Sequence, residues 1–303
     1  MAGCDQAKRC RAVALPPQGV PDGLMLVIDR DSGPSGQLTV RLTVAEGMQP
    51  GLLKLTIDGK LFEARVLPDT DSARWDDGDA LAVARALAAG RRAEASQDGK
   101  ALGAVPLAGA SAALLFVDDA QRRLGTKGAF VRQGRKADDA AAVIRPTLLP
   151  YSGLRTAPAP LSLAGAVRKQ GALAGMDCDP VDKPTDAATP LDASTTLILL
   201  ECDSGAYNLV QRAFLVRDGK AATAQPVLGE LAEGVTNADF DARYRTLGGL
   251  TKGRGVGDCG SIDRWAWTGK AFVRAERSVM DACRGVPPQW WITVDRSALA
   301  VAL

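Results

Sequence analysis

The sequence predicts a mainly β protein with a few helices, an α+β fold of two β-rich domains joined by a proline-rich linker and held by disulfides. Three observations predict it. Short runs rich in β-branched residues alternate apolar and polar side chains, Gly/Pro turns separate these runs, and six cysteines are spread along the 303 residues. Each domain is expected to be a sandwich or a barrel-like sheet carrying one or two helices.

The first half is expected to be rich in strands. Residues 11–15, 24–30 and 37–44 show the strand pattern. Asp58-Gly59 separates two further alternating runs, which is the strongest short signal for a hairpin. The apolar side of this hairpin is expected to hold Leu53, Leu55, Ile57 and, after the turn, Leu61 or Phe62.

Two helices are predicted after this hairpin. The first is capped by Asp79 and ends at Gly90. The second begins near Ser111 and stops at Gly125, and its apolar face is expected to contain Ala112, Leu114, Leu115 and Phe116. Residues 126–135 are then expected to form a short strand.

A linker is predicted at residues 146–160, where four prolines exclude regular structure. We therefore expect a first domain at 1–145, a linker with a short helix at 146–175, and a second domain at 176–303. The second domain is expected to contain an apolar strand at 194–202, hairpins about Asp218-Gly219 and Thr268-Gly269, a short helix at 240–249, and a strand at 290–297.

The cysteines favour three sequential disulfides, Cys4–Cys10, Cys178–Cys202 and Cys259–Cys283, with both wide pairs 24 positions apart. Six cysteines allow fifteen pairings, so this prediction rests on proximity. Such disulfides indicate a periplasmic or secreted protein, whereas six free thiols in a cytosolic protein are the alternative.

The start of the chain, MAGCDQ, has neither the basic segment nor the apolar core of a signal peptide. An exported chain would then be a processed form with an added Met1. Ala-Gly-Cys4 also resembles the end of a lipoprotein cleavage box, and lipidation there would remove Cys4 from its disulfide. No apolar run reaches the ~18 residues of a membrane span, and a net charge of +2 gives no reason to expect nucleic acid as a partner.

The chain contains no histidine. This excludes the usual serine and cysteine hydrolases, which need an imidazole base, and makes a catalytic zinc site a poor fit. We predict no metal and no cofactor.

Four glycines lie close together in TKGRGVGDCGSIDRWAW, residues 251–267. Neither a Walker A loop nor a Rossmann fingerprint fits, because a strand rather than a helix is expected to follow. The favoured interpretation is a turn that presents Cys259 to its partner. The alternative is an anion site formed by Lys252, Arg254 and the backbone amides of Gly255 and Gly257.

Trp265 and Trp267 lie two apart on a predicted strand and so face the same side. We expect them to form the second core together with Trp290 or Trp291. The alternative is an aromatic surface for a glycan or peptide.

Two acidic segments are candidate sites. Asp69, Asp71 and Asp77 have some of the alternation of a calcium loop but lack its glycine and its bidentate glutamate, so a solvated loop is favoured. Asp118-Asp119 would pair with Arg122 and Arg123 along a helix. Adjacent helical carboxylates point apart and cannot flank one glycosidic bond.

Four blocks carry a family resemblance: the opening CDQAKRCRA, PLAGASAALLFVDDAQRRLGTKGAFV (106–131), LECDSGAYN (200–208) and KGRGVGDCGSIDRWAWTGKAFV (252–273). Together they resemble domain-of-unknown-function family 1176, uncharacterised bacterial envelope proteins. The first half is similar to the invasion-associated locus B proteins, which are exported. The resemblance implies export and carries no catalytic residues.

The favoured function is a non-catalytic binding or interaction module of the bacterial periplasm, with an unknown protein or glycan partner in the envelope. One alternative is a histidine-free, carboxylate-dependent enzyme acting on cell-wall glycan, and another is an inhibitor-like protein against a lytic enzyme. Two convergent carboxylates in one cleft would favour the enzyme.

Overall fold

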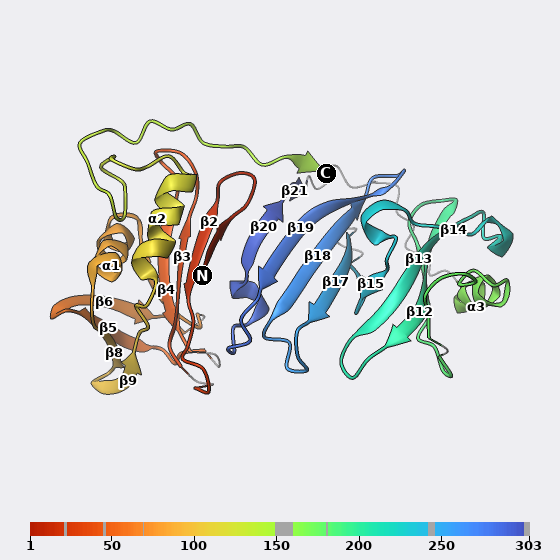
Figure 1. Cartoon of the computed structure of the whole chain (residues 1–303), viewed down its shortest axis with the longest axis horizontal. Helices are drawn as coiled ribbons and strands as arrows, with labels where there is room; N and C mark the ends of the chain where they lie inside the picture. Colours follow the sequence, from red (N-terminus) through yellow and green to blue (C-terminus); the bar gives the residue numbers. More distant parts are fainter. Residues whose placement is uncertain are drawn as a thin grey trace. The chain divides into compact units, whose positions relative to one another are not determined.

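The computed structural model describes residues 1–20, 23–44, 47–68, 70–148, 160–179, 181–241 and 246–299 (Figure 1). Its chain forms two compact units. The first unit contains Met1–Arg145, Gly257–Cys259 and Ser278–Arg296. The second contains Pro146–Val256, Gly260–Arg277 and Ser297–Leu303.

Two antiparallel sheets build the first unit, and both are open. The larger has the order β1-β2-β3-β4-β7, with β1 (Ala2–Cys4), β2 (Cys10–Ala14), β3 (Met25–Arg30), β4 (Leu38–Thr43) and β7 (Ala73–Asp76). The smaller has the order β6-β5-β8-β9, with β5 (Gly51–Ile57), β6 (Lys60–Val66), β8 (Ala93–Gln97) and β9 (Lys100–Ala104).

The two predicted helices of the first unit are α1 (Asp77–Ala89) and α2 (Ala110–Ala120). Helix α1 ends at Gly90 as predicted, but its N-cap is Asp76, so the expected cap Asp79 lies inside the first turn. In α2, Leu114 and Val117 are buried while Phe116 is 48% exposed, so the apolar face is narrower than predicted.

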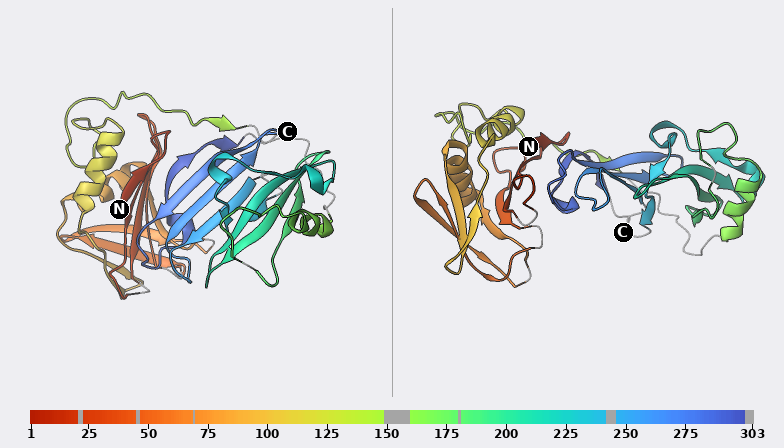
Figure 2. Two further views of the ribbon diagram at one scale, coloured as in Figure 1. Left: turned by 45° about the vertical axis from the view of Figure 1, so that its right-hand side comes forward. Right: turned by 60° about the horizontal axis from the view of Figure 1, so that its bottom comes forward.

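One hydrophobic core joins both sheets and both helices of the first unit, as Figure 2 shows for α1 and α2 against the strands. Alternate residues of β3 and β5, such as Ile28 and Leu55, point into it, as do Val83 of α1 and Leu114 of α2. Each such side chain contributes roughly 1.5–3 kcal/mol when fully buried. This packing of one sheet face, a second sheet and two helices confirms the predicted β-rich α+β class.

The hairpin turns predicted at Asp58-Gly59 and Thr268-Gly269 are present. Asp58 and Gly59 have φ of 45° and 85°, as a two-residue type I′ turn requires, and β5 pairs with β6. Leu55 lies opposite Phe62, which packs on the core, whereas Leu61 is exposed. Gly269 (φ 87°) likewise lies between two neighbouring strands.

The strand predicted at residues 126–135 is wrong. These residues form turns, with one isolated bridge between Thr126 and Lys136. The buried Asp118 carboxylate accepts hydrogen bonds from the amides of Phe130 and Val131, each at 2.9 Å. A side chain of α2 therefore takes the place of a neighbouring strand as the hydrogen-bond acceptor for these amides.

The second unit is built on two further sheets. One has the order β11-β12-β13-β14, with β15 also paired to β13: β11 (Ala187–Pro190), β12 (Thr195–Ser204), β13 (Leu209–Arg217), β14 (Gln225–Pro226) and β15 (Val235–Thr236). The other has the order β16-β17-β18-β19-β20: β16 (Asp239–Asp241), β17 (Thr246–Lys252), β18 (Gly260–Trp267), β19 (Phe272–Met280) and β20 (Ile292–Arg296). The division between the units falls within β19, and β20 belongs to the first unit.

Short elements complete the described chain. They are the parallel pair β10 (Thr147–Leu148) and β21 (Ala298–Leu299), helix α3 (Leu161–Lys169), and the 3₁₀ turns η1 (Ala221–Thr223), η2 (Gly229–Leu231) and η3 (Pro288–Trp290). Helix α3 forms where a short helix was predicted. Residues 149–159, most of the predicted linker, lie outside the described residues.

Strand β12 has a continuous apolar sequence because both of its faces are buried. Leu197 and Leu199 face a core with Trp265 and Trp267, while Ile198 and Leu200 face a second core with α3. A strand buried on both faces has no polar side to alternate with. Helix α3 contacts β11 and β12, as the right panel of Figure 2 shows.

The helix predicted at 240–249 is wrong within the described residues. β16 and β17 occupy its two ends, and Phe240 pairs with Leu247 across them. A side chain on Gly249 would bring its Cβ 2.9 Å from Val235 and 3.5 Å from Trp265. Glycine at this position thus permits close strand packing, which outweighs the helical pattern.

Candidate functional site

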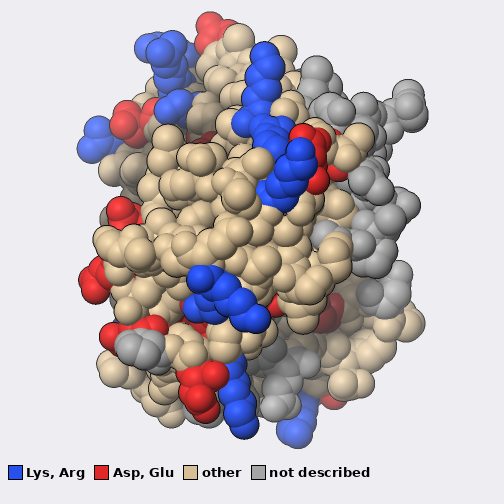
Figure 3. Space-filling view, turned by 90° about the vertical axis from the view of Figure 1, so that its right-hand side faces the viewer, with Lys and Arg blue, Asp and Glu red and all other residues tan. Residues whose placement is uncertain are grey.

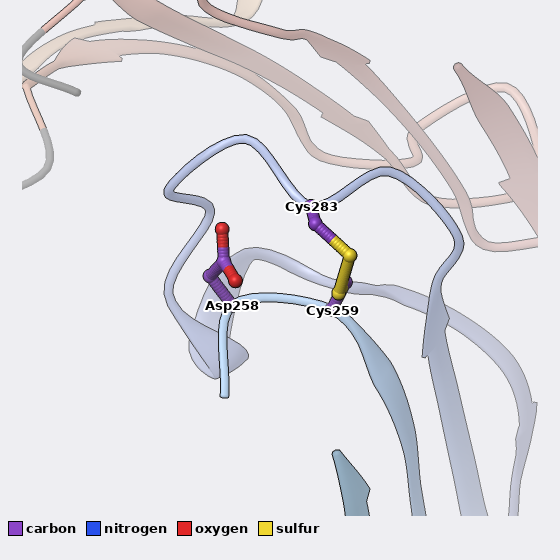
Figure 4. Close-up of side chains that lie close together, drawn as sticks. All are labelled: Asp258, Cys259 and Cys283. Carbon is purple, nitrogen blue, oxygen red and sulfur yellow. A yellow bond between two sulfur atoms is a disulfide. The ribbon is translucent and has the colours of Figure 1, made fainter. Parts of the chain in front are cut away.

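Three disulfides join the pairs that sequence proximity favours, Cys4–Cys10, Cys178–Cys202 and Cys259–Cys283. Asp258 lies beside the last of these (Figure 4). Its carboxylate accepts a hydrogen bond from the amide of Gly285 at 2.6 Å. Asp258, Cys259 and Cys283 have potential metal-ligand atoms within 4.8 Å of one another. Both sulfurs are bonded to each other, however, and a metal ligand must be a thiolate. This group is therefore a structural crosslink.

The glycine loop begins where β17 ends. The Lys252 amide donates to the Asn208 side chain at 3.0 Å, and Asn208 donates back to the Lys252 carbonyl at 2.9 Å. Tyr207 adds a hydrogen bond to the Gly253 carbonyl. The Lys252 amide therefore already donates its hydrogen bond within the protein.

Gly260 has a stricter role than the other glycines of this loop. Its φ is 130°, and a Cβ there would lie 1.9 Å from the Thr251 carbonyl oxygen. Gly257 also has positive φ, at 69°, while Arg254 and Gly255 are exposed. Strand β18 follows the loop. These features agree with a conformational role for the glycines, and the anion site at Lys252, Arg254, Gly255 and Gly257 stays a hypothesis.

Trp265 and Trp267 are 6% and 0% exposed and belong to one core of the second unit. Their position matches the core interpretation and leaves no aromatic surface at these two residues. Trp290 and Trp291 are also buried, but they lie in the first unit. The prediction that one of them joins the core around Trp265 and Trp267 is therefore wrong.

A polar pocket of about 150 Å³ opens beside Trp265 in the second unit. Strands β15, β17, β18 and β19 and the turn η2 contribute to it. Its charged residues are Glu230, Asp263, Arg274 and Arg277, and its hydroxyl groups come from Thr236 and Thr251.

The two carboxylates of this pocket share one guanidinium. Arg274 Nε lies 3.1 Å from Glu230 Oε2 and 3.7 Å from Asp263 Oδ1. Arg277 lies 3.6 Å from the same Asp263 oxygen, and the Trp265 indole N–H donates to Glu230 at 2.9 Å. Glu230 and Asp263 are therefore close neighbours, and cationic or N–H donor groups already contact both.

Asp263 has an altered acidity. Burial raises the pKa of its carboxyl above the ordinary aspartate value, Arg277 and Arg274 oppose this, and the Glu230 charge raises it further. A carboxyl in this setting holds its proton more readily than an exposed one.

Only part of this pocket could be predicted from the sequence. Asp263 and Trp265 are two apart on the predicted hairpin, so strand alternation places them on one face. Glu230 lies in a 3₁₀ turn more than thirty positions earlier, and no spacing connects it to Asp263. Detecting it required the tertiary fold.

The other acidic candidates have structural roles. The predicted pairs Asp118–Arg122 and Asp119–Arg123 are wrong, because Asp118 binds backbone amides and Arg123 pairs with Asp138. Burial raises the pKa of Asp118. Asp71 and Asp77 are exposed, and Asp69 lies outside the described residues, so the calcium-loop hypothesis gains no support.

The comparisons with known proteins identify the family. The profile of the family described as "Protein of unknown function (DUF1176)" matches residues 1–297. The chain belongs to this family. It is 30% identical over 225 residues to the "Uncharacterized protein YpfG" of Escherichia coli (strain K12), an alignment that covers 65% of this chain and 64% of the relative. No solved structure matches it.

The three disulfides indicate that this DUF1176 chain is an extracytoplasmic protein, because such bonds persist in oxidising compartments. None of the helices in the described residues is long and apolar enough to cross a membrane. Figure 3 shows one face of the molecule, on which acidic and basic side chains are scattered over a mostly uncharged surface.

Proposed function

We propose that this DUF1176 protein is a non-catalytic binding protein of the bacterial periplasm, and that the pocket beside Trp265 takes a hydroxyl-bearing group of an envelope glycan. The observation that carries this is the contact of Arg274 with both Glu230 and Asp263. Carboxylates, guanidinium groups and threonine hydroxyls together offer acceptors and donors to a polyhydroxylated ligand.

The same contact argues against acid–base catalysis. A glycosidase needs one carboxyl group that can protonate the leaving oxygen and a second that can attack or activate water. Here one guanidinium contacts both carboxylates, and the Trp265 N–H occupies an oxygen of Glu230. Arg274 therefore holds the pair in an ion-paired state suited to binding.

One observation favours the carboxylate-dependent enzyme as a second candidate. The raised pKa of Asp263, next to a second carboxylate, is the property of a general acid. In that case Asp263 would donate the proton and Glu230 would act on the opposite face of the scissile bond.

The three disulfides support the periplasm as the proposed compartment, because it is oxidising and disulfides persist there. The resemblance of the first half to the exported invasion-associated locus B proteins, which rests on the sequence alone, is a second argument for export.

Titration calorimetry of the full disulfide-bonded chain with the peptidoglycan disaccharide GlcNAc–MurNAc tests the binding role. We expect saturable binding that Glu230→Gln weakens about tenfold, because a hydrogen bond to a charged group is lost. Glu233→Gln is the matched control: its carboxylate also pairs with an arginine, Arg212, but its side chain is 95% exposed and lies outside the pocket. Absence of saturable binding, or equal weakening by both variants, would count against the proposal.

A further inference from the structure

A second polar pocket, of about 140 Å³, lies in the first unit on the larger sheet. Arg41 of β4 and Arg74 of β7 line it together with Arg9, Thr39 and two aspartates. Ile28 of β3 and Val40 and Leu42 of β4 point into the core. Strand alternation therefore places Asp29, Thr39 and Arg41 on the opposite face of the sheet. This pocket is separate from the one beside Trp265.

The aspartate at the base of the pocket is already neutralised. Arg11 holds both oxygens of Asp29, with Nε at 2.7 Å and Nη2 at 3.0 Å. Burial would raise the pKa of Asp29, but this hydrogen bond and the charges of Arg11, Arg41 and Arg9 outweigh it and lower the pKa. Arg41 also lies 2.7 Å from Asp29. Arg11 alone balances the negative charge of Asp29. The positive charge of Arg41 therefore exceeds what is required to neutralise this aspartate.

The other two arginines have exposed partners. Arg9 lies 3.2 Å from Asp31, and Arg74 lies 2.7 Å from Asp76. Side chains of these partners are 42% and 49% exposed, so water screens both pairs and each contributes little. The guanidinium groups of Arg9 and Arg74 can therefore bind an anionic ligand without breaking a buried ion pair.

Arg41 and Arg74 are direct cross-strand partners. Like charges directly opposite each other destabilise a sheet. The Arg41 guanidinium is held at 5.2 Å over the Trp290 ring, and its buried Nε has no hydrogen-bond acceptor within the described part of the chain. A buried donor without an acceptor is costly. An anion between the two arginines would remove the repulsion between their charges.

We propose that this pocket binds a phosphate group between Arg41 and Arg74, with Arg9 and the Thr39 hydroxyl as further donors. Guanidinium groups suit phosphate because they present several N–H donors in a planar fork to its oxygens. Donors here come from separate segments of the chain, which fits a tetrahedral ligand with oxygens on several sides. The ligand is inorganic phosphate, a soluble phosphate monoester or a phospholipid headgroup.

Titration calorimetry with sodium phosphate at constant ionic strength, on the full disulfide-bonded chain, tests this site. We expect one saturable site that Arg74→Gln weakens about tenfold, the effect of one charged hydrogen bond. Arg92→Gln is the matched control and should leave the affinity unchanged. Arg92 directly precedes β8 in the same unit and, like Arg74, contacts an acidic side chain two residues on, Glu94, at 2.7 Å.

Two further probes distinguish the sources. Glycerol phosphate that binds as tightly as inorganic phosphate assigns the site to a soluble ligand. Sedimentation with phosphatidylglycerol vesicles that Arg74→Gln abolishes and Arg92→Gln preserves assigns it to a lipid headgroup. Binding to none of the three probes, or equal weakening by both variants, overturns the proposal. Far-UV circular dichroism verifies that each variant is folded.

Discussion

The indole N–H of Trp265 donates a hydrogen bond to the Glu230 carboxylate at 2.9 Å. Trp265 comes from β18 and Glu230 from the turn η2, so this bond connects two distant segments of the second unit at the edge of its polar pocket. An almost fully buried tryptophan therefore also positions a charged group.

Trp265→Phe should destabilise the protein more than Trp75→Phe. Both indoles donate at 2.9 Å and are 6% and 5% exposed, but Trp75 donates to the neutral Glu63 carbonyl. Hydrogen bonds to charged groups are stronger, so we expect a difference of about 1 kcal/mol in the free energy of unfolding, measured in urea. Equal losses would show that the Glu230 charge adds nothing.

Asp29 and Asp263 should give opposite dependences on pH. The lowered pKa of Asp29 means that its ionised form stabilises the fold, so the wild-type advantage over Asp29→Asn is lost as pH falls below about 4. The raised pKa of Asp263 means that its protonated form is favoured by folding. The wild-type advantage over Asp263→Asn should therefore shrink as pH rises above about 4.

Urea unfolding of wild type and both variants between pH 3 and pH 7 measures these differences. The two aspartates should give slopes of opposite sign. Slopes of the same sign would contradict the assigned surroundings of one of them.

Removing the Cys178–Cys202 disulfide should cost more than removing Cys4–Cys10. The sequence separations are 24 and 6 residues, and the chain-entropy account gives about 3 and about 2 kcal/mol respectively. Paired cysteine-to-serine variants, compared by urea unfolding, provide the measurement. A larger loss from the short loop would point to native-state contacts as the dominant contribution.

Gly59→Ala should weaken the β5–β6 hairpin by about 1 kcal/mol. Gly59 has φ of 85° and no atom within 4 Å of an added Cβ, so the whole cost is conformational. Gly165, inside α3, also has no atom nearby but lacks positive φ. Gly165→Ala should therefore stabilise the protein by about 0.5–1 kcal/mol. Thermal unfolding of both variants compares them, and destabilisation by both would contradict this explanation.

The sequence predicted local features well. Asp58-Gly59 identified its hairpin because the turn needs two residues with positive φ. The apolar run at 194–202 identified a strand, which the structure shows to be buried on both faces. The disulfide pairs followed from proximity along the chain.

Features that depend on distant contacts were missed. The apolar run near Phe130 resembled a strand, but Asp118 satisfies its amides from a helix. The pocket brings Glu230 to Asp263 through packing, and no local pattern marks Glu230. Arg41 and Arg74 face each other only because β4 pairs with β7 rather than with the next strand in sequence.

We propose that Glu230 and Asp263, held by Arg274, bind a glycan without catalysing its cleavage. Chromatography of peptidoglycan fragments after long incubation with stoichiometric wild-type protein tests this proposal. We expect unchanged fragments. Cleavage that Asp263→Asn abolishes, and that the control variant Glu233→Gln retains, would contradict it and establish the carboxylate-dependent enzyme.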